Sequence, residues 1–412
     1  MGGPFNHCGQ LLFCSDMRRD YLLITGLAIL FFFSFLGGVH LFDRDEVSIA
    51  ECAREMLLTG EWIRPQIDFH AFSERPPMFL WAQAISMYLF GINEFAARFP
   101  NAVCGLVTLL LVYRIGSRLH DRMFAWIWVL AWLGSILPHL FFRSGIVDPW
   151  FNLLVFAGLY GFIEFRWQFL TAQHKQSFLG RYKYLLVGGG LLGMAIMTKG
   201  FSAYLIAMLV LGLYWGRYRF QGKGYFAHLA VFSAAAMFWV AAWIGLDAFL
   251  HGSGYIGRFL ADQSRFFTAP PGSEGGFYGE QLLILLLGCF PVSVFALPNM
   301  WGDRQPAEEL MESNTLAACK RSDLVTWMQL LFWSGLVLAS VVRTDSIQYS
   351  SLCYFPLTYL GSITIWRAVR WDIQPRVVGY LLPAVGVLFG AAVMAIPYYL
   401  GHHSSILRFV FA

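Results

Sequence analysis

Three acidic side chains, Asp43, Asp45 and Glu46, follow the first long apolar stretch of the chain directly. Acids at this place have an ordinary explanation, because carboxylates are favoured in the first turn of a helix and a solvated acidic cap needs no function. The alternative is catalytic, since a carboxylate at a bilayer surface can act as a general base on an acceptor hydroxyl. The residues alone leave both interpretations open.

Another acid, Asp148, opens a later apolar stretch on what we expect to be the same side of the membrane. Its position suits a helix cap. An ionisable group at the end of a membrane helix is also a candidate for a functional site. We therefore consider Asp45, Glu46 and Asp148 as candidate catalytic acids.

Three cations lie in segments expected on that side as well: Arg75 before Pro76 and Pro77, Lys199 between Thr198 and Gly200, and Arg265 in the run 263–267. Each has a simpler explanation, namely a turn that starts a helix, a lysine that snorkels to the interface and an exposed basic residue. Cations gathered at one membrane face suit a phosphate, and arginine binds it with a fork geometry. A polyprenyl-phosphate sugar needs both a phosphate site and a base, and it is itself a membrane lipid.

The elements that must position these residues are membrane helices. Hydrophobic residues make up 58% of the 412 residues and charged residues only 13%, which is too little charge to cover a soluble domain of this length. Many apolar blocks reach the ~20 residues that a helix needs to cross the hydrocarbon core. We predict an all-α polytopic membrane protein with about eleven spans. They lie at 20–41, 96–116, 123–142, 146–165, 184–198, 200–216, 226–249, 278–298, 324–342, 347–366 and 377–400.

Charge placement predicts the orientation of these spans. With the N-terminus in the cytoplasm, every cytoplasmic connection is basic, as the positive-inside rule requires. The basic residues of these connections are Arg114, Arg118, Arg122, Arg166, Lys175, Arg181, Lys183, Arg217, Arg219, Lys223, Arg304, Lys320, Arg321, Arg367, Arg370 and Arg376. The long segments 42–95 and 250–277 then lie outside, and the polar linker 299–323 lies inside. Within the first outer segment we expect interfacial helices at 46–58 and 78–90.

The cysteines and histidines give no sign of a metal site. The seven cysteines contain no C-x-x-C pair, so neither a disulfide framework nor a zinc site is indicated. His251 and Glu74 could meet at the outer face, but one histidine and one acid are weak grounds for a metal. We expect no cofactor, and the sequence leaves dependence on a divalent metal open. No Gly-rich phosphate loop is present, and we expect no nucleic acid as a partner.

Four stretches occur in a recognisable order: 45–56, 60–62, 74–77 and 93–100. Together they resemble the glycosyltransferase 39/83 group, GT-C fold enzymes that include bacterial aminoarabinose transferases and protein O-mannosyltransferases. The resemblance runs from about residue 40 to residue 365, and Asp148, the Thr-Lys-Gly at 198–200 and Arg265 match later motifs of the group.

This resemblance implies a GT-C-like bundle and an inverting transfer of a sugar from a polyprenyl (undecaprenyl) phosphate. The acceptor would be an outer-leaflet or periplasmic molecule such as lipid A, a glycan or a protein, and the location a bacterial inner membrane. Asp45 would be the catalytic carboxylate, with Glu46 and Asp148 as further acids. Arg75, Lys199 and Arg265 would hold the lipid phosphate.

The chain departs from the family pattern in two motifs and in length. Ser48-Ile49 stand where relatives often carry Arg-Tyr, and Asp345 and Gln348 stand where relatives tend to carry Lys and His. An acid near a phosphate site weakens binding, so a catalytically altered, lipid-binding relative is one alternative function. A lipid flippase or transporter is another, although such proteins carry their charges near the midplane. Because many relatives extend further, we expect a single transmembrane domain over 1–412 without their C-terminal soluble domain.

Overall fold

The protein is built almost entirely of helices in a computed structural model, which describes residues 5–41, 44–171, 178–217, 225–252, 254–268, 279–302, 315–341, 347–373, 375–376, 378–387 and 390. The elements, in order, are α1 (Phe5–Ala28), η1 (Ile29–Phe33), α2 (Arg44–Thr59), β1 (Gln66–Ile67), β2 (His70–Ala71), α3 (Met78–Phe90), α4 (Glu94–Leu119), α5 (Arg122–Leu133), α6 (Ile136–Phe142), α7 (Asp148–Thr171), α8 (Phe178–Lys199), α9 (Ser202–Arg217), α10 (Tyr225–His251), α11 (Gly254–Thr268), α12 (Glu280–Gly288), α13 (Val292–Ala296), η2 (Leu297–Asn299), α15 (Thr315–Val341), η3 (Ile347–Cys353) and α16 (Tyr354–Trp371). A short apolar helix, Val378–Val387, follows. The strands β1 and β2 form a small antiparallel hairpin.

Four helices of the described chain are long and apolar enough to cross a membrane: α4, α7, α10 and α15. Two bent pairs, α5 with α6 and α12 with α13 and η2, raise this number to six if each pair is one span. The prediction of an all-helical membrane fold is therefore confirmed. The number of eleven spans, the interfacial placement of α2 and α3, and the single domain over 1–412 stay predictions.

Two expected spans are broken rather than continuous. The span at 123–142 bends by 74° between α5 and α6, and the span at 278–298 bends by 113° between α12 and α13. Pro138 and Pro291 explain the breaks, because proline has no N–H for the carbonyl four residues earlier and its ring clashes with that carbonyl. The first span, expected over 20–41, also ends early, since helical structure stops at Phe33. Part of the last span, 377–400, lies outside the described residues.

Glycines allow α7, α8 and α10 to pack closely. A Cβ on Gly161 of α7 would lie 2.8 Å from the Cα of Gly188 on α8, and a Cβ on Gly193 of α8 would lie 2.4 Å from the backbone oxygen of Ala236 on α10. Small residues are the usual means by which membrane helices approach each other in lipid. The seam matters for the site because α7 begins at Asp148 and α8 ends at Lys199.

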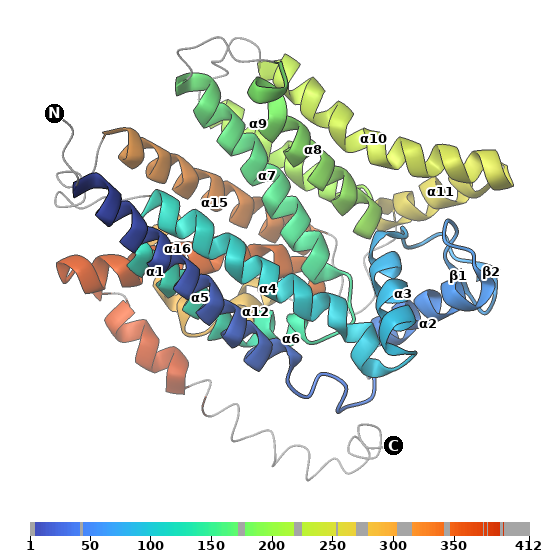
Figure 1. Ribbon diagram of the computed structural model, residues 1–412, viewed down its shortest axis with the longest axis horizontal. Helices are drawn as coiled ribbons and strands as arrows, with labels where there is room; N and C mark the ends of the chain where they lie inside the picture. The colour runs from blue at the N-terminus through green and yellow to red at the C-terminus, as the bar shows by residue number, and fades with distance from the viewer. Residues whose placement is uncertain are drawn as a thin grey trace.

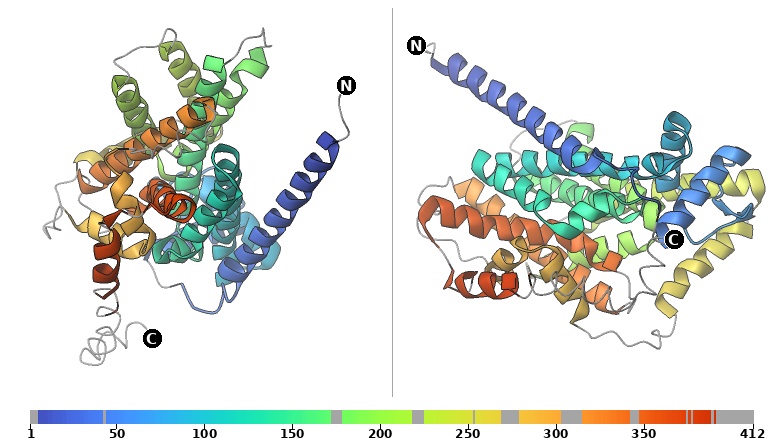
Figure 2. Two further views of the ribbon diagram at one scale, coloured as in Figure 1. Left: turned by 90° about the vertical axis from the view of Figure 1, so that its left-hand side faces the viewer. Right: turned by 90° about the horizontal axis from the view of Figure 1, so that it is seen from below.

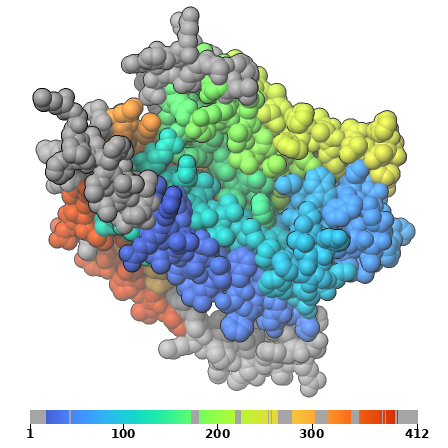
Figure 3. All heavy atoms as spheres, viewed as in Figure 1, coloured from blue at the N-terminus to red at the C-terminus, as the bar shows by residue number. Residues whose placement is uncertain are grey.

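The connections fall into two groups at opposite ends of the bundle. Figure 1 shows α2, α3, α11 and the β-hairpin together at the right-hand end, whereas α1 begins at the left. The right-hand view of Figure 2 shows the same separation, and Figure 3 shows the light blue and yellow segments of that end at the right. Contacts join the ends expected in the cytoplasm: Asp20 with Arg122, Arg118 with Glu164, and Asp121 with Arg370. We call the other end, which carries α2, α3 and α11, the outer end.

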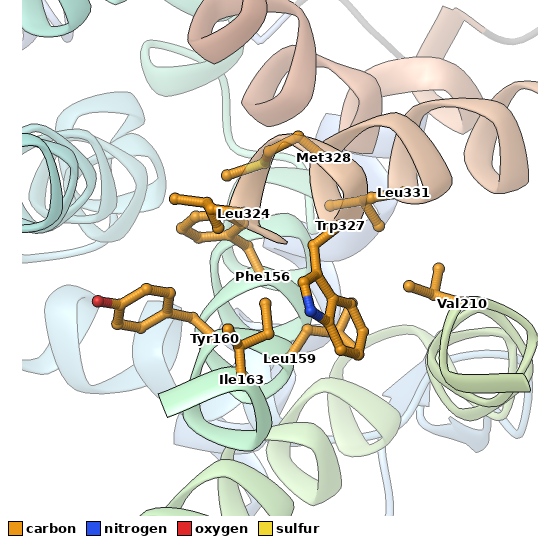
Figure 4. Close-up of a pocket in the computed structure, with 9 residues that line it drawn as sticks. All are labelled: Phe156, Leu159, Tyr160, Ile163, Val210, Leu324, Trp327, Met328 and Leu331. Atoms are coloured by element: carbon orange, nitrogen blue, oxygen red, sulfur yellow. The ribbon is translucent and has the colours of Figure 1, made fainter. Parts of the chain in front are cut away.

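An apolar pocket lies inside the bundle among α7, α9 and α15 (Figure 4). Its walls include Phe156, Trp327 and Leu331, and no charged side chain is among the described residues that line it. It is therefore distinct in chemistry from the charged groups at the outer end.

Candidate active site at the outer end of the bundle

Asp45 and Arg75, predicted as base and phosphate ligand, are in contact. Asp45 is the second residue of α2, and its Oδ2 lies 3.3 Å from Nη2 of Arg75, which precedes α3. The Asp45 side chain keeps 36% of its surface exposed. A carboxylate that a substrate can reach, next to a guanidinium, is thus present where the sequence predicted it. Asp43 lies outside the described residues.

Glu46, the neighbouring acid, has quite different surroundings. It is fully buried, and its two oxygens accept hydrogen bonds from Nε and Nη2 of Arg98 at 2.7 and 3.0 Å. Oε1 also accepts the backbone N–H of Gly145 at 2.6 Å. These contacts favour a positioning role for Glu46 over the catalytic role expected from the sequence.

Arg98 extends this connection to the end of the first helix. Its guanidinium also donates to the backbone oxygens of Leu36, Val39 and His40 at distances of 2.7 to 3.1 Å. The α2 N-terminus, α4 and the segment after η1 are therefore held by one buried cation. We expected no role for Arg98 from the sequence, although an arginine near the outer end of an apolar span is a usable signal.

Asp148 and Lys199 form the second pair of the site. Oδ1 of Asp148 lies 2.5 Å from Nζ of Lys199, and the two side chains are only 1% and 13% exposed. Nζ of Lys199 also lies 5.6 Å from the ring centroid of Phe151. Removing one member of such a buried pair leaves an unbalanced charge, so the two groups act as a unit.

The loop 143–147 connects the two pairs. Glu46 holds Gly145 of this loop, and Gln83 of α3 donates to the Gly145 carbonyl at 3.2 Å. Asn101 of α4 donates to the carbonyls of Ser144 and Ile146 at 2.6 and 2.7 Å. Because α7 starts directly after this loop, Asp148 is placed relative to α2 and hence to Asp45.

Helix α11 connects the three cation-bearing segments. Asp262 accepts the hydroxyl of Ser73, two residues before Arg75, at 2.5 Å. Gln263 accepts the backbone N–H of Phe201, just after the Lys199–Gly200 turn, at 3.3 Å. Arg265 belongs to the same helix, but its side chain lies outside the described residues, as do Asp345 and the side chain of Gln348. The helix that carries Arg265 thus contacts the segments that carry the other two cations.

Tyr255 of α11 also holds the loop before α3. Burial, together with the charge of Asp247, raises the pKa of Tyr255. Its hydroxyl donates to the Phe72 carbonyl at 3.2 Å.

A further charged cluster lies beside this site and was not predicted. Arg64 forms two hydrogen bonds with Asp247 at 2.5 and 3.2 Å, and His251 lies 3.3 Å from Asp247 and 3.1 Å from Glu61. These partners of His251 differ from Glu74, the contact considered above. Across the described ranges, no group of three or more His, Cys, Asp and Glu side chains is arranged to hold a metal ion.

Comparison with known proteins finds sequence similarity to sugar transferases. A family described as dolichyl-phosphate-mannose-protein mannosyltransferase matches residues 74–243. An undecaprenyl phosphate-alpha-4-amino-4-deoxy-L-arabinose arabinosyl transferase of Pectobacterium carotovorum is 26% identical over 403 residues, covering 92% of this chain and 66% of that protein. The protein of the same name from Edwardsiella ictaluri is 32% identical over 280 residues, covering 66% and 48%. The chain thus spans about half to two thirds of the length of these relatives.

Solved structures show the fold. ArnT from Cupriavidus metallidurans bound to undecaprenyl phosphate superimposes with a TM-score of 0.71 at 20% identity, over 92% of this chain and 64% of that one. The Archaeoglobus fulgidus oligosaccharyltransferase superimposes with a TM-score of 0.55 at 12% identity, over 89% and 54%. The resemblance found in the sequence is confirmed: this chain has the GT-C fold, and it is similar in sequence to named aminoarabinose transferases and, over residues 74–243, to the protein mannosyltransferase family.

Proposed function

We propose that the protein is an inverting glycosyltransferase that moves a sugar from a polyprenyl monophosphate to a hydroxyl group of an acceptor at the outer face of the membrane. One observation carries the proposal. Two carboxylate–cation pairs, Asp45–Arg75 and Asp148–Lys199, are held together at the outer end by the loop 143–147 and by α11. A base and a phosphate site are what this transfer requires.

The proposed step is a single displacement. The acceptor hydroxyl attacks the anomeric carbon, its proton passes to Asp45, and the bond from that carbon to the phosphate oxygen breaks with its electron pair leaving on the phosphate. Arg75, Lys199 and Arg265 stabilise the charge that develops on the leaving phosphate. Attack opposite the leaving group inverts the anomeric configuration.

Phosphate binding and base activation are linked in this site. Arg75 lies 3.3 Å from Asp45. A phosphate that binds Arg75 competes with Asp45 for the same guanidinium. Donor binding would then turn Asp45 towards the acceptor.

The remaining assignments rest on charge placement and on the relatives. We infer a bacterial inner membrane location with about eleven spans, a cytoplasmic N-terminus and an outer-face site. The relatives are named for transfer of aminoarabinose from undecaprenyl phosphate, so this sugar donor and lipid A as acceptor are the first pair to try. We infer no cofactor.

The test uses the purified full chain with labelled undecaprenyl-phosphate sugars and with lipid A as acceptor. Transfer of label to the acceptor, with release of undecaprenyl phosphate, is the expected result. Donor binding without transfer for every sugar and acceptor would point to the alternative, a lipid-binding relative that has lost catalysis. Movement of the unmodified lipid between leaflets of proteoliposomes, again without transfer, would point to a flippase.

A further inference from the structure

The carboxamide of Gln263 is a buried polar group that the proposed step does not use. Gln263 lies on α11 and is only 8% exposed. Its Oε1 accepts the Phe201 N–H at 3.3 Å. Its Nε2 is shielded from solvent and has no hydrogen-bond partner among the described residues. Buried amide donors are normally paired, and an unpaired one calls for an explanation.

The orientation of this carboxamide follows from its neighbour. The Phe201 N–H is a donor and must face an acceptor, so exchanging Oε1 with Nε2 would place two donors against each other. The turn is also shaped around the group. Gly200 has φ +90°, and a Cβ on it would lie 2.0 Å from Oε1 of Gln263. Oε1 of Gln263 therefore accepts the hydrogen bond from the turn, and the N–H groups of Nε2 can donate to a ligand.

The surroundings define what that ligand must be. Gly200 directly follows Lys199, and Asp262, next to Gln263, holds Ser73 two residues before Arg75. The unpaired donor thus lies between two cation-bearing segments. A group that accepts hydrogen bonds and carries negative charge fits this position, and a phosphate oxygen has both properties.

We propose that Gln263 is a phosphate-binding residue. Its Nε2–H donates to an oxygen of the donor lipid's phosphate, while its Oε1 fixes the turn that carries Lys199. The identification of the phosphate as that of a polyprenyl lipid rests on the proposed function. One side chain then ties the position of Lys199 to the presence of the phosphate.

Two variants separate phosphate binding from a purely structural role of Gln263 in holding the turn. Gln263→Glu keeps an acceptor for the Phe201 N–H but removes the N–H donor and adds a negative charge. Gln263→Met has similar length and removes both functions. Dissociation constants for undecaprenyl phosphate, measured at pH 8 by tryptophan fluorescence in detergent, and thermal unfolding temperatures are compared with those of the wild type.

If Gln263 binds phosphate, Gln263→Glu raises the Kd about ten- to a hundred-fold, more than Gln263→Met does, and unfolds close to the wild-type temperature. If Gln263 only holds the turn, the order reverses, because Met abolishes the hydrogen bond to Phe201 and Glu keeps it. The proposal is overturned if Gln263→Met raises the Kd more than Gln263→Glu does. It is also overturned if Gln263→Glu binds the lipid as tightly as the wild type does.

Failure of this inference is distinguishable from failure of the proposed function. A wild type that binds the lipid but transfers no sugar contradicts the proposed function. The role of Gln263 would then still be supported by a larger increase in Kd in Gln263→Glu than in Gln263→Met. Normal transfer and donor affinity in Gln263→Glu contradict the role of Gln263 alone. A parallel titration with inorganic phosphate identifies the source of the ligand. Equal affinity for inorganic phosphate, with the same loss in Gln263→Glu, would overturn the assignment to a lipid phosphate.

Discussion

Asp45 and Asp148 each contact a cation, but their exposure separates what they can do. The Asp45 side chain is 36% exposed and the Asp148 side chain 1%. A general base must come within hydrogen-bond reach of the proton that it removes. Asp45 meets this condition for an acceptor that arrives from outside, whereas Asp148 is better placed to hold Lys199.

We expect Asp45→Asn to abolish transfer while donor binding and folding stay close to normal. The amide fills the same space but cannot take the proton, and loss of a general base typically lowers the rate ~10²–10⁴-fold. Turnover measured at saturating donor, alongside the Kd for undecaprenyl phosphate, tests this. Near-normal turnover would make Asp45 a helix cap and direct the search for the base to Asp148.

Glu46→Gln should instead act on stability. It leaves the buried Arg98 without its counter-charge, which typically costs about 3–5 kcal/mol. Glu51→Gln is a matched control on the same helix, because the Glu51–Arg54 pair is about one third exposed on each side and such pairs contribute only about 0.2–1 kcal/mol. Thermal unfolding temperatures of the two variants test this: Glu46→Gln should unfold well below the wild type and Glu51→Gln close to it. An inactive Glu46→Gln protein of wild-type stability would restore a catalytic role for Glu46.

The close packing of α8 against α10 depends on individual glycines. Gly193→Ala places a Cβ 2.4 Å from the Ala236 oxygen, whereas the same change at Gly190, one turn away, finds its nearest neighbour at 3.5 Å. We expect overpacking to lower the free energy of unfolding of Gly193→Ala by about 1–3 kcal/mol. For Gly190→Ala, the free energy of unfolding should stay unchanged or rise by up to about 1 kcal/mol, because alanine has the higher helix propensity. Equal unfolding temperatures would show that α8 and α10 can move apart without cost.

Long helices were predictable from the sequence because an apolar run of this length has one stable structure in lipid. The spans expected at 96–116 and 226–249 lie within α4 and α10. The breaks were harder to predict, since proline acts differently by position. Pro100 lies inside α4 without ending it, so a proline within an apolar run does not by itself predict a break. Pro138 and Pro291 lie deep in their spans, where the chain bends.

The site was predictable as a set of charges on one side but not as a set of contacts. Charge placement put Asp45, Asp148 and the three cations at one face. Which acid meets which cation depends on how α2, α7, α8 and α11 pack, and this information is spread over residues such as Arg98, Gln83 and Asn101. Asp45 and Arg75 are 30 residues apart in sequence, and Asp148 and Lys199 are 51 apart, so these pairings leave no local sequence pattern.

We expect the two ends of the bundle to face opposite sides of the membrane. We expect the His70→Cys variant, changed in an exposed strand of the first outer segment, to react with an impermeant maleimide on intact cells. Cys319 is exposed and lies on the side expected in the cytoplasm, so it should react only after permeabilisation. Cys8 and Cys14 are replaced by Ser to remove background.

Native Cys52 should stay unlabelled in both conditions. Burial raises its pKa to about 12, and the thiolate is the reactive form, so at pH 8 the thiol is both covered and protonated. If the thiol introduced by His70→Cys were labelled only after permeabilisation, the topology would be inverted and the site would lie in the cytoplasm.

The glycine seam has a mechanical consequence. Asp148 and Lys199 stand at the ends of α7 and α8, two helices whose backbones touch, so their separation cannot change unless those helices part. Asp45 and Arg75 stand on α2 and on the loop before α3, which are attached through side chains of Glu46, Gln83 and Ser73. The first pair is therefore held by close backbone packing of its helices, and the second by side chains, including the buried apolar cluster that α2 and α3 share with the start of α4. If the protein has the proposed function, we expect the α7–α8 side to hold the donor phosphate in one position, so that acceptors of different size are accommodated on the α2–α3 side.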